Sequence, residues 1–137
     1  MQPPISPPRE QGYANIVSWK RSTPETFIEI DIAGYKRTCL LDTGCDYSLI
    51  PRRLVPTARL SPVNLDIYTA NGSPIHILGW MTVRFHICGI PIIADLLVSE
   101  DIHKFLLGYD WLVAQGAHWF FDRKVLLLHG KEIPLRL

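Results

Sequence analysis

The sequence has few cysteines, little net charge and no long apolar run, and each shortage excludes a class of protein. Its 137 residues include three cysteines, Cys39, Cys45 and Cys88, without the Cys and His spacing of a zinc site, so we expect free thiols in a reducing compartment and no metal. The net charge of +1 is too small for binding to a phosphate backbone. No apolar stretch approaches the roughly 20 residues of a membrane span. These shortages indicate a soluble, cytoplasmic protein that binds no cofactor, nucleic acid or membrane.

Prolines are sparse over most of the chain but not at its start. Four of the eleven prolines stand within the first eight residues, which predicts a Pro-rich linker or N-terminal extension over residues 1–24. The remaining residues, 25–137, carry regular apolar patterning and suffice for one hydrophobic core but not for two. We therefore predict a single folded domain over residues 25–137.

Alternation of apolar and polar residues predicts a domain built mainly of β-strands. The expected strands are 15–19, 26–32, 35–41, 47–50, 65–70, 74–85, 83–87, 90–98, 117–121, 124–128 and 133–137. The Asn-Gly pair at 71–72 predicts a type I′ hairpin turn, in which both residues have positive φ. The only predicted helix is 109–115, and 51–62 reads as a loop or one helical turn. The apolar strand 90–98 is expected to bury Asp95, which would then need a partner.

One short motif indicates a chemistry. Leu40-Leu41-Asp42-Thr43-Gly44 places a carboxylate between an apolar strand and a glycine, where the acid can be held beside backbone amides. The tripeptide alone is weak evidence, because a given tripeptide occurs by chance in roughly a few per cent of chains of this size. The alternative is a turn aspartate in an unrelated β domain, so the surrounding residues have to decide.

Three further features resemble the retropepsin family, the aspartic proteases of retroviruses and gypsy-type LTR retrotransposons, over about residues 26–137. Residues 45–50, Cys-Asp-Tyr-Ser-Leu-Ile, are similar to the end of the active-site loop and the strand after it. Residues 66–73 resemble the flap, a hairpin that closes over the substrate. Residues 106–112 resemble the apolar-apolar-Gly strand and the helix that pack beneath the catalytic loop. The order and spacing of these motifs agree with the family as a set.

The resemblance implies an all-β, single-lobe acid-protease (retropepsin) barrel with a flap hairpin and one short C-terminal helix, assembled as a homodimer. Peptide hydrolysis by this route uses two carboxylates that share one proton, one acting as base towards water and the other as acid. The sequence holds one Asp-Thr-Gly and no Asp-Ser-Gly, so the second Asp42 must come from a second copy of the chain. The implied function is an aspartic endopeptidase that processes its own retroelement polyprotein, in the cytoplasm or within retroelement particles.

The resemblance also implies roles for the residues around Asp42. Thr43 would hydrogen-bond across the dimer, Gly44 would lie along the bound peptide, and Asp46 would receive the backbone amides of the substrate. Cys45 stands where the family often has alanine and would line the cleft, where a thiol would make activity sensitive to oxidation. The flap residues expected to cover the polypeptide substrate are Tyr68, Thr69, Ala70, Asn71, Gly72 and Ser73.

Some alternatives stay open on the sequence alone. Retroviral members often carry arginine after the glycine matched to Gly108, whereas this chain has Tyr109, which puts the family's ion pair at this position in doubt and is closer to the retrotransposon branch. The hairpin at 71–72 could be an ordinary turn without a lid function. The alternative function is a domesticated, non-catalytic dimerisation or peptide-binding module, although the intact triplet at Asp42 favours the enzyme.

Overall fold

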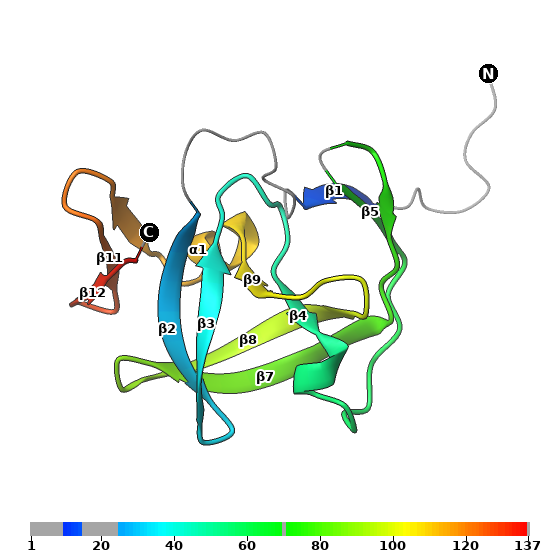
Figure 1. Ribbon diagram of the computed structural model, residues 1–137, viewed down its shortest axis with the longest axis horizontal. Helices are drawn as coiled ribbons and strands as arrows, with labels where there is room; N and C mark the ends of the chain where they lie inside the picture. Colours follow the sequence, from blue (N-terminus) through cyan, green and yellow to red (C-terminus); the bar gives the residue numbers. More distant parts are fainter. Residues whose placement is uncertain (1–9, 15–24, 70, 137) are drawn as a thin grey trace.

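Six strands form a closed barrel. The computed structural model describes residues 10–14, 25–69 and 71–136, so the strand expected at 15–19 lies outside the described residues, as does Ala70. In barrel order the strands are β2 (Thr26–Ile32), β3 (Tyr35–Leu41), β9 (Phe105–Leu107), β4 (Leu49–Pro51), β8 (Ile90–Ser99) and β7 (Gly79–Ile87). β7 returns to β2 where His86 lies opposite Asp31, which closes the barrel (Figure 1).

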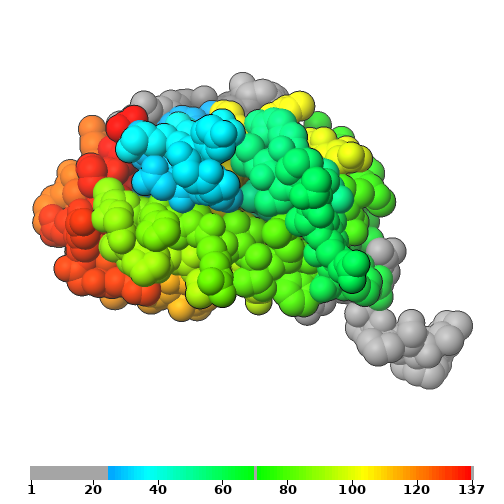
Figure 2. All heavy atoms as spheres, turned by 90° about the horizontal axis from the view of Figure 1, so that it is seen from below, coloured from blue at the N-terminus to red at the C-terminus, as the bar shows by residue number. Residues whose placement is uncertain are grey.

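Two small sheets, one short helix and one helical turn complete the described structure. The first sheet contains β1 (Glu10–Ala14), β5 (Leu65–Thr69) and β6 (Pro74–Ile75), and the second contains β10 (His118–Phe120), β11 (Val125–Leu128) and β12 (Lys131–Pro134). The helix is α1 (Tyr109–Ala114), and η1 (Arg52–Leu54) is a single 3-10 turn within the segment expected to be a loop or helical turn. Seen from below, the yellow-green β7 and β8 lie beneath the blue and cyan β2 and β3, with the orange and red C-terminal strands at their left (Figure 2). The all-β prediction with one short helix is confirmed.

Tight hairpin turns occur at X-Gly pairs other than the predicted one. Positive φ angles at both central residues occur at 33–34, 88–89 and 129–130, which join β2 to β3, β7 to β8 and β11 to β12. The type I′ prediction at 71–72 is wrong, because the hairpin closes between Thr69 and Ser73: the Thr69 N–H donates to the Ser73 carbonyl oxygen at 2.7 Å, and the Gly72 N–H donates to the Thr69 carbonyl oxygen at 2.9 Å. The reason is local: the Asn71 side-chain oxygen accepts the Ser73 N–H at 3.3 Å, an Asx-type arrangement that favours a longer turn.

The barrel interior is filled by alternate residues of its strands. On β2, Ile28, Ile30 and Ile32 point inwards, and the Phe85 and Phe105 rings meet edge to face at 5.4 Å. Burial of such apolar side chains is the main favourable term in folding.

The prediction that Asp95 is buried is wrong. Asp95 lies on the outer face of β8 and accepts a hydrogen bond from Thr82 Oγ1 on β7 at 2.7 Å. Inward-facing and outward-facing residues therefore alternate along this part of β8. The outward-facing Ile93, which is 59% exposed, is apolar, so the sequence alone resembles a continuous apolar run.

The strand expected over residues 74–85 is divided into β6 and β7. Gly79 lies at the division, where an added Cβ would stand 2.6 Å from the Ser61 carbonyl oxygen. Ser61 and Trp80 exchange backbone hydrogen bonds of 2.9 Å in both directions, so a second segment crosses the chain at this point. β6 pairs with β5 alone, while β7 continues with β8, and this frees the β5–β6 hairpin from the barrel sheet.

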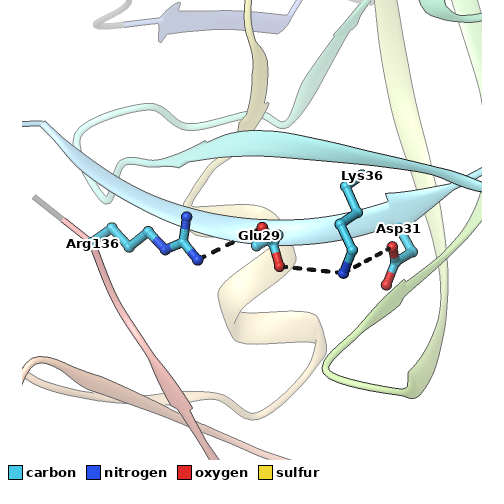
Figure 3. A network of polar contacts seen from close by, with 4 residues as sticks. All are labelled: Glu29, Asp31, Lys36 and Arg136. Carbon is cyan, nitrogen blue, oxygen red and sulfur yellow. Dashed lines mark ion pairs between the residues drawn. The ribbon is translucent and has the colours of Figure 1, made fainter.

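The last described residue lies along β2. Arg136 and Phe27 exchange backbone hydrogen bonds of 2.7 and 2.9 Å, so this end of the extended segment expected at 133–137 pairs within the same chain. Beside it, Arg136, Glu29, Lys36 and Asp31 form a row of charge contacts on the outer surface, with N to O distances of 3.6, 3.7 and 4.0 Å (Figure 3). These side chains are largely exposed, so their contribution to stability is small.

Candidate active site

Asp42 directly follows β3, where the neighbouring barrel strand β9 bonds to its backbone. The last residue of β3, Leu41, is paired with Leu107 of the parallel strand β9. The Asp42 N–H donates to the Leu107 carbonyl oxygen at 3.1 Å, so the ladder continues into the first residue of the loop. Because the end of β3 is buried and paired on both sides, the backbone position of Asp42 is well fixed.

The loop that follows turns back on the Asp42 carboxylate. The Gly44 N–H donates to Asp42 Oδ1 at 2.8 Å, and the Cys45 N–H donates to the Asp42 carbonyl oxygen at 3.2 Å. Asp42 is half-buried, whereas Thr43, Gly44 and the later residue Asp46 are exposed. The amide of Gly44 therefore holds one carboxylate oxygen in place, and the loop presents the group at the surface of the chain.

The amino end of α1 supports the loop from the other side. The N–H groups of Tyr109 and Asp110 donate to the carbonyl oxygens of Cys45 and Asp46 at 2.8 and 3.3 Å. The approach depends on Gly108, because an added Cβ there would lie 2.5 Å from the Cys45 carbonyl oxygen. The resemblance placed this strand and helix beneath the catalytic loop, and the structure has them there.

Ser48 and Asp110 form a polar brace that was not predicted from the sequence. Ser48 Oγ donates to Asp110 Oδ1 at 2.7 Å, and the Ser48 N–H donates to Asp110 Oδ2 at 3.2 Å. Ser48 Oγ in turn accepts the Gly108 N–H at 2.9 Å. The one available signal was an acidic residue in the first turn of a predicted helix, where an acid is favourable. The Tyr109 side chain is 58% exposed, whereas the next residue, Asp110, makes the contacts with Ser48.

Cys45 was expected to line the cleft, and the structure places its side chain elsewhere. Its side chain is fully buried, and Sγ donates to the Tyr47 carbonyl oxygen at 2.9 Å. It packs in a cluster that includes Leu40, Leu49 and Ile67. In this arrangement the Cys45 side chain contributes packing beneath the loop, and its backbone bonds to Asp42 and Tyr109.

The hairpin of β5 and β6 is closed by its own polar groups. The Thr69 N–H donates to the Ser73 carbonyl oxygen at 2.7 Å, and Ser73 N–H donates to Thr69 Oγ1 at 3.1 Å. Thr69 Oγ1 also contacts Asn71 Oδ1. Thr69 is buried, whereas Asn71, Gly72 and Ser73 are exposed, and Tyr68 is half-buried. The expected flap residues thus share one hairpin, apart from Ala70, which lies outside the described residues.

The hairpin packs against the same core as the Asp42 loop. Leu65, Ile67 and Ile75 of the hairpin belong to the cluster that contains Cys45 and Leu49. Beside them lies a cavity of about 340 Å³ between the hairpin and the segment 101–106. Its apolar lining comes from Leu40, Pro74, Ile75, Ile102 and Leu106, and its polar lining from Thr69, Asp101, His103 and Lys104. A cavity with this mainly apolar lining could take up an apolar side chain.

A second hollow, of about 470 Å³, begins at Thr43 and runs over α1 and β10. Tyr109, Val113 and Phe121 are 58, 59 and 68% exposed along it. Phe121 also stacks on Trp119 with ring centroids 4.8 Å apart. Large apolar side chains gathered on one exposed surface are typical of a protein interface.

The described residues contain no group of three or more His, Cys, Asp and Glu side chains able to hold a metal ion. Across the same part of the chain, no helix is long and apolar enough to cross a membrane.

Comparison with known proteins gives a fold but no sequence family. No protein-family model matches the chain, and no curated protein has a matching sequence. The structure is similar to the crystal structure of the retroviral protease-like domain of Ddi1 from Leishmania major, with a TM-score of 0.68 and 17% identity. The match covers 84% of this chain and 96% of that one. At this identity the similarity establishes the fold alone.

The closed six-stranded barrel with one short helix is therefore a retropepsin-like fold. On this fold the chain carries Asp-Thr-Gly, in the loop between β3 and β4.

Proposed function

We propose that the chain is an aspartic endopeptidase that works as a homodimer, with each subunit supplying Asp42. The observation that carries the proposal is the Asp42 carboxylate, held by the Gly44 amide at 2.8 Å on a loop fixed to β9 and α1. A fixed carboxylate at the surface activates water when a second carboxylate keeps the shared proton. The retropepsin-like fold supports peptide hydrolysis as the reaction class.

In this proposal the second carboxylate comes from a second copy of the chain. Thr43, directly after Asp42, lines the hollow that continues over α1 to Phe121. A two-fold axis beside Thr43 would bring both Asp42 loops together and cover Tyr109, Val113 and Phe121 in the same step. Association would thus complete the site and remove apolar surface from water.

The proposed substrate is an extended polypeptide, and the retroelement polyprotein that contains the domain is its natural source. The cavity of about 340 Å³ beside Thr69 would receive an apolar side chain. Asp46 and the exposed flap residues 71–73 are proposed to contact the substrate backbone, which would bind as an added strand.

The test is cleavage of a broad peptide library by the parent, Asp42→Asn and Asp95→Asn. The last variant is a matched control, because Asp95 lies on the outer face of β8 and bonds to Thr82. We expect cleavage by the parent and by Asp95→Asn and none by Asp42→Asn. Mixing the parent with equal Asp42→Asn should leave about one quarter of the activity of undiluted parent, because only parent homodimers hold two aspartates.

Two results would contradict the proposal. Activity that persists in Asp42→Asn would remove the carboxylate mechanism, and residual activity of about one half in the equal mixture would show that each chain works alone. Absence of cleavage by a parent preparation shown to be dimeric would favour the non-catalytic peptide-binding module.

A further inference from the structure

Strand β1 occupies an edge of the flap. Residues Glu10–Ala14 pair in parallel with β5 over its whole length, from Glu10 opposite Leu65 to Ala14 opposite Thr69. The other edge of β5 is paired with β6. Both edges of the flap strand are therefore filled by the chain itself, and in the view of Figure 1 β1 lies between β5 and the loop that joins β3 to β4.

The direction of the backbone groups in β5 follows from the hydrogen bond between Thr69 and Ser73. The Thr69 N–H donates to Ser73, towards β6. Because N–H and C=O groups alternate between the two edges of a strand, the amides of Asp66 and Tyr68 face β1. Asp66 lies opposite Gln11, and Tyr68 opposite Tyr13.

This register makes Gly12 the central bonding residue of β1. In a parallel pair, a residue bonds to the two neighbours of the residue opposite it. Asp66 then bonds to Glu10 and Gly12, and Tyr68 bonds to Gly12 and Ala14. Gly12 uses both its N–H and its C=O towards β5, whereas the Gln11 N–H points to the opposite side.

We propose that the β1 edge of β5 is the peptide-binding edge of the flap, and that Glu10–Ala14 holds it in the resting chain as a built-in competitor of the substrate. The inference rests on the proposed function for the identity of the displaced peptide. A substrate that adds to β5 as a strand has no other edge available, since β6 takes the remaining one. Binding of the substrate then requires displacement of β1.

The experiment compares three variants of the full chain. Gly12→Pro removes the N–H that faces β5, Gly12→Ala keeps that N–H, and Gln11→Pro removes an N–H that faces away. We expect amide hydrogen exchange at Asp66 and Tyr68, measured by NMR, to become faster in Gly12→Pro alone. In cleavage assays, Gly12→Pro should lower KM about fivefold with kcat unchanged, the factor that one backbone hydrogen bond supplies.

A second probe separates this inference from the proposed protease activity. A fluorescent synthetic peptide with the sequence of residues 8–16 should bind Gly12→Pro with a Kd about fivefold below that for the parent, whether or not any variant cleaves. Binding without cleavage would therefore support the proposal that β1 occupies the β5 edge and would contradict the proposed protease activity. Equal exchange in all three variants, or an equal Kd for parent and Gly12→Pro, would overturn the occupied edge. Faster exchange with an unchanged KM in an active enzyme would overturn the competition with substrate.

Discussion

Asp110 receives two hydrogen bonds from Ser48, one from the hydroxyl at 2.7 Å and one from the backbone N–H at 3.2 Å. Asp110 Oδ1 also accepts the N–H of Trp111 at 2.7 Å, so the carboxylate joins the residue before β4 to the first turn of α1. Both segments hold the Asp42 loop in place: Ser48 follows the loop in the chain, and the α1 amides bond to its carbonyl oxygens. The position of a candidate catalytic group therefore depends on a carboxylate that has no role in the proposed chemistry itself.

Asp110→Ala is expected to lower the free energy of unfolding by about 2–4 kcal/mol, because it leaves the buried donors of Ser48 without their acceptor. Asp110→Asn retains one acceptor oxygen and should lose about half as much. Urea denaturation measures both, with the exposed Asp122→Ala as the control. A loss below about 0.5 kcal/mol in Asp110→Ala, the level of an ordinary surface change, would contradict the brace.

Gly108→Ala is expected to displace the Asp42 loop. The added Cβ would meet the Cys45 and Tyr47 carbonyl oxygens at 2.5 and 2.8 Å, both of them backbone atoms. We expect a loss of at least about 2 kcal/mol in unfolding free energy and a lower kcat for peptide cleavage.

Gly34→Ala, in the turn between β2 and β3, is the matched control for that change. Its φ of 82° makes alanine unfavourable by about 1 kcal/mol, but an added Cβ there meets no atom within 4 Å. It should lose stability without losing kcat. Equal effects of the two substitutions on kcat would show that close packing at Gly108 does not position the loop.

The three thiols are expected to react at different rates. Cys88 is exposed, whereas Cys39 and Cys45 are fully buried, and burial raises the pKa of the Cys39 thiol well above its ordinary value. Mass spectrometry after brief treatment with iodoacetamide should show one modified thiol in the native protein and three after denaturation. Rapid modification of Cys45 in the native protein would instead restore the expectation of an accessible thiol in the cleft.

The row of charges on β2 and β3 is expected to contribute little. Glu29 contacts both Lys36 and Arg136, but its side chain is 43% exposed and theirs are 72 and 66% exposed. Glu29→Gln should therefore change the free energy of unfolding by less than about 1 kcal/mol. Denaturation at low and high salt measures the effect, and a loss above about 2 kcal/mol at both would show a coupled network instead.

Patterns that act within a few residues were predictable from the sequence. Alternation gave β2 and β3 with the bounds observed, and the glycine after the apolar run located α1 to within a residue. The Asp42 triplet was found as a motif, because the chemistry of its loop is encoded in three consecutive residues. The brace between Ser48 and Asp110 was not predictable, because 62 positions separate the two residues and neither is unusual alone.

The sequence by itself determined strands such as β2 and β3, the place of the helix α1 and which carboxylate is the candidate for catalysis. Only the tertiary structure decided that Asp95 faces outwards, that the Cys45 thiol is buried and that β1 pairs with β5. The physical reason is the range of the interactions. Backbone propensity and alternation act between neighbours, whereas the exposure of a side chain and the partner of a strand edge depend on which distant segments the closed barrel brings together.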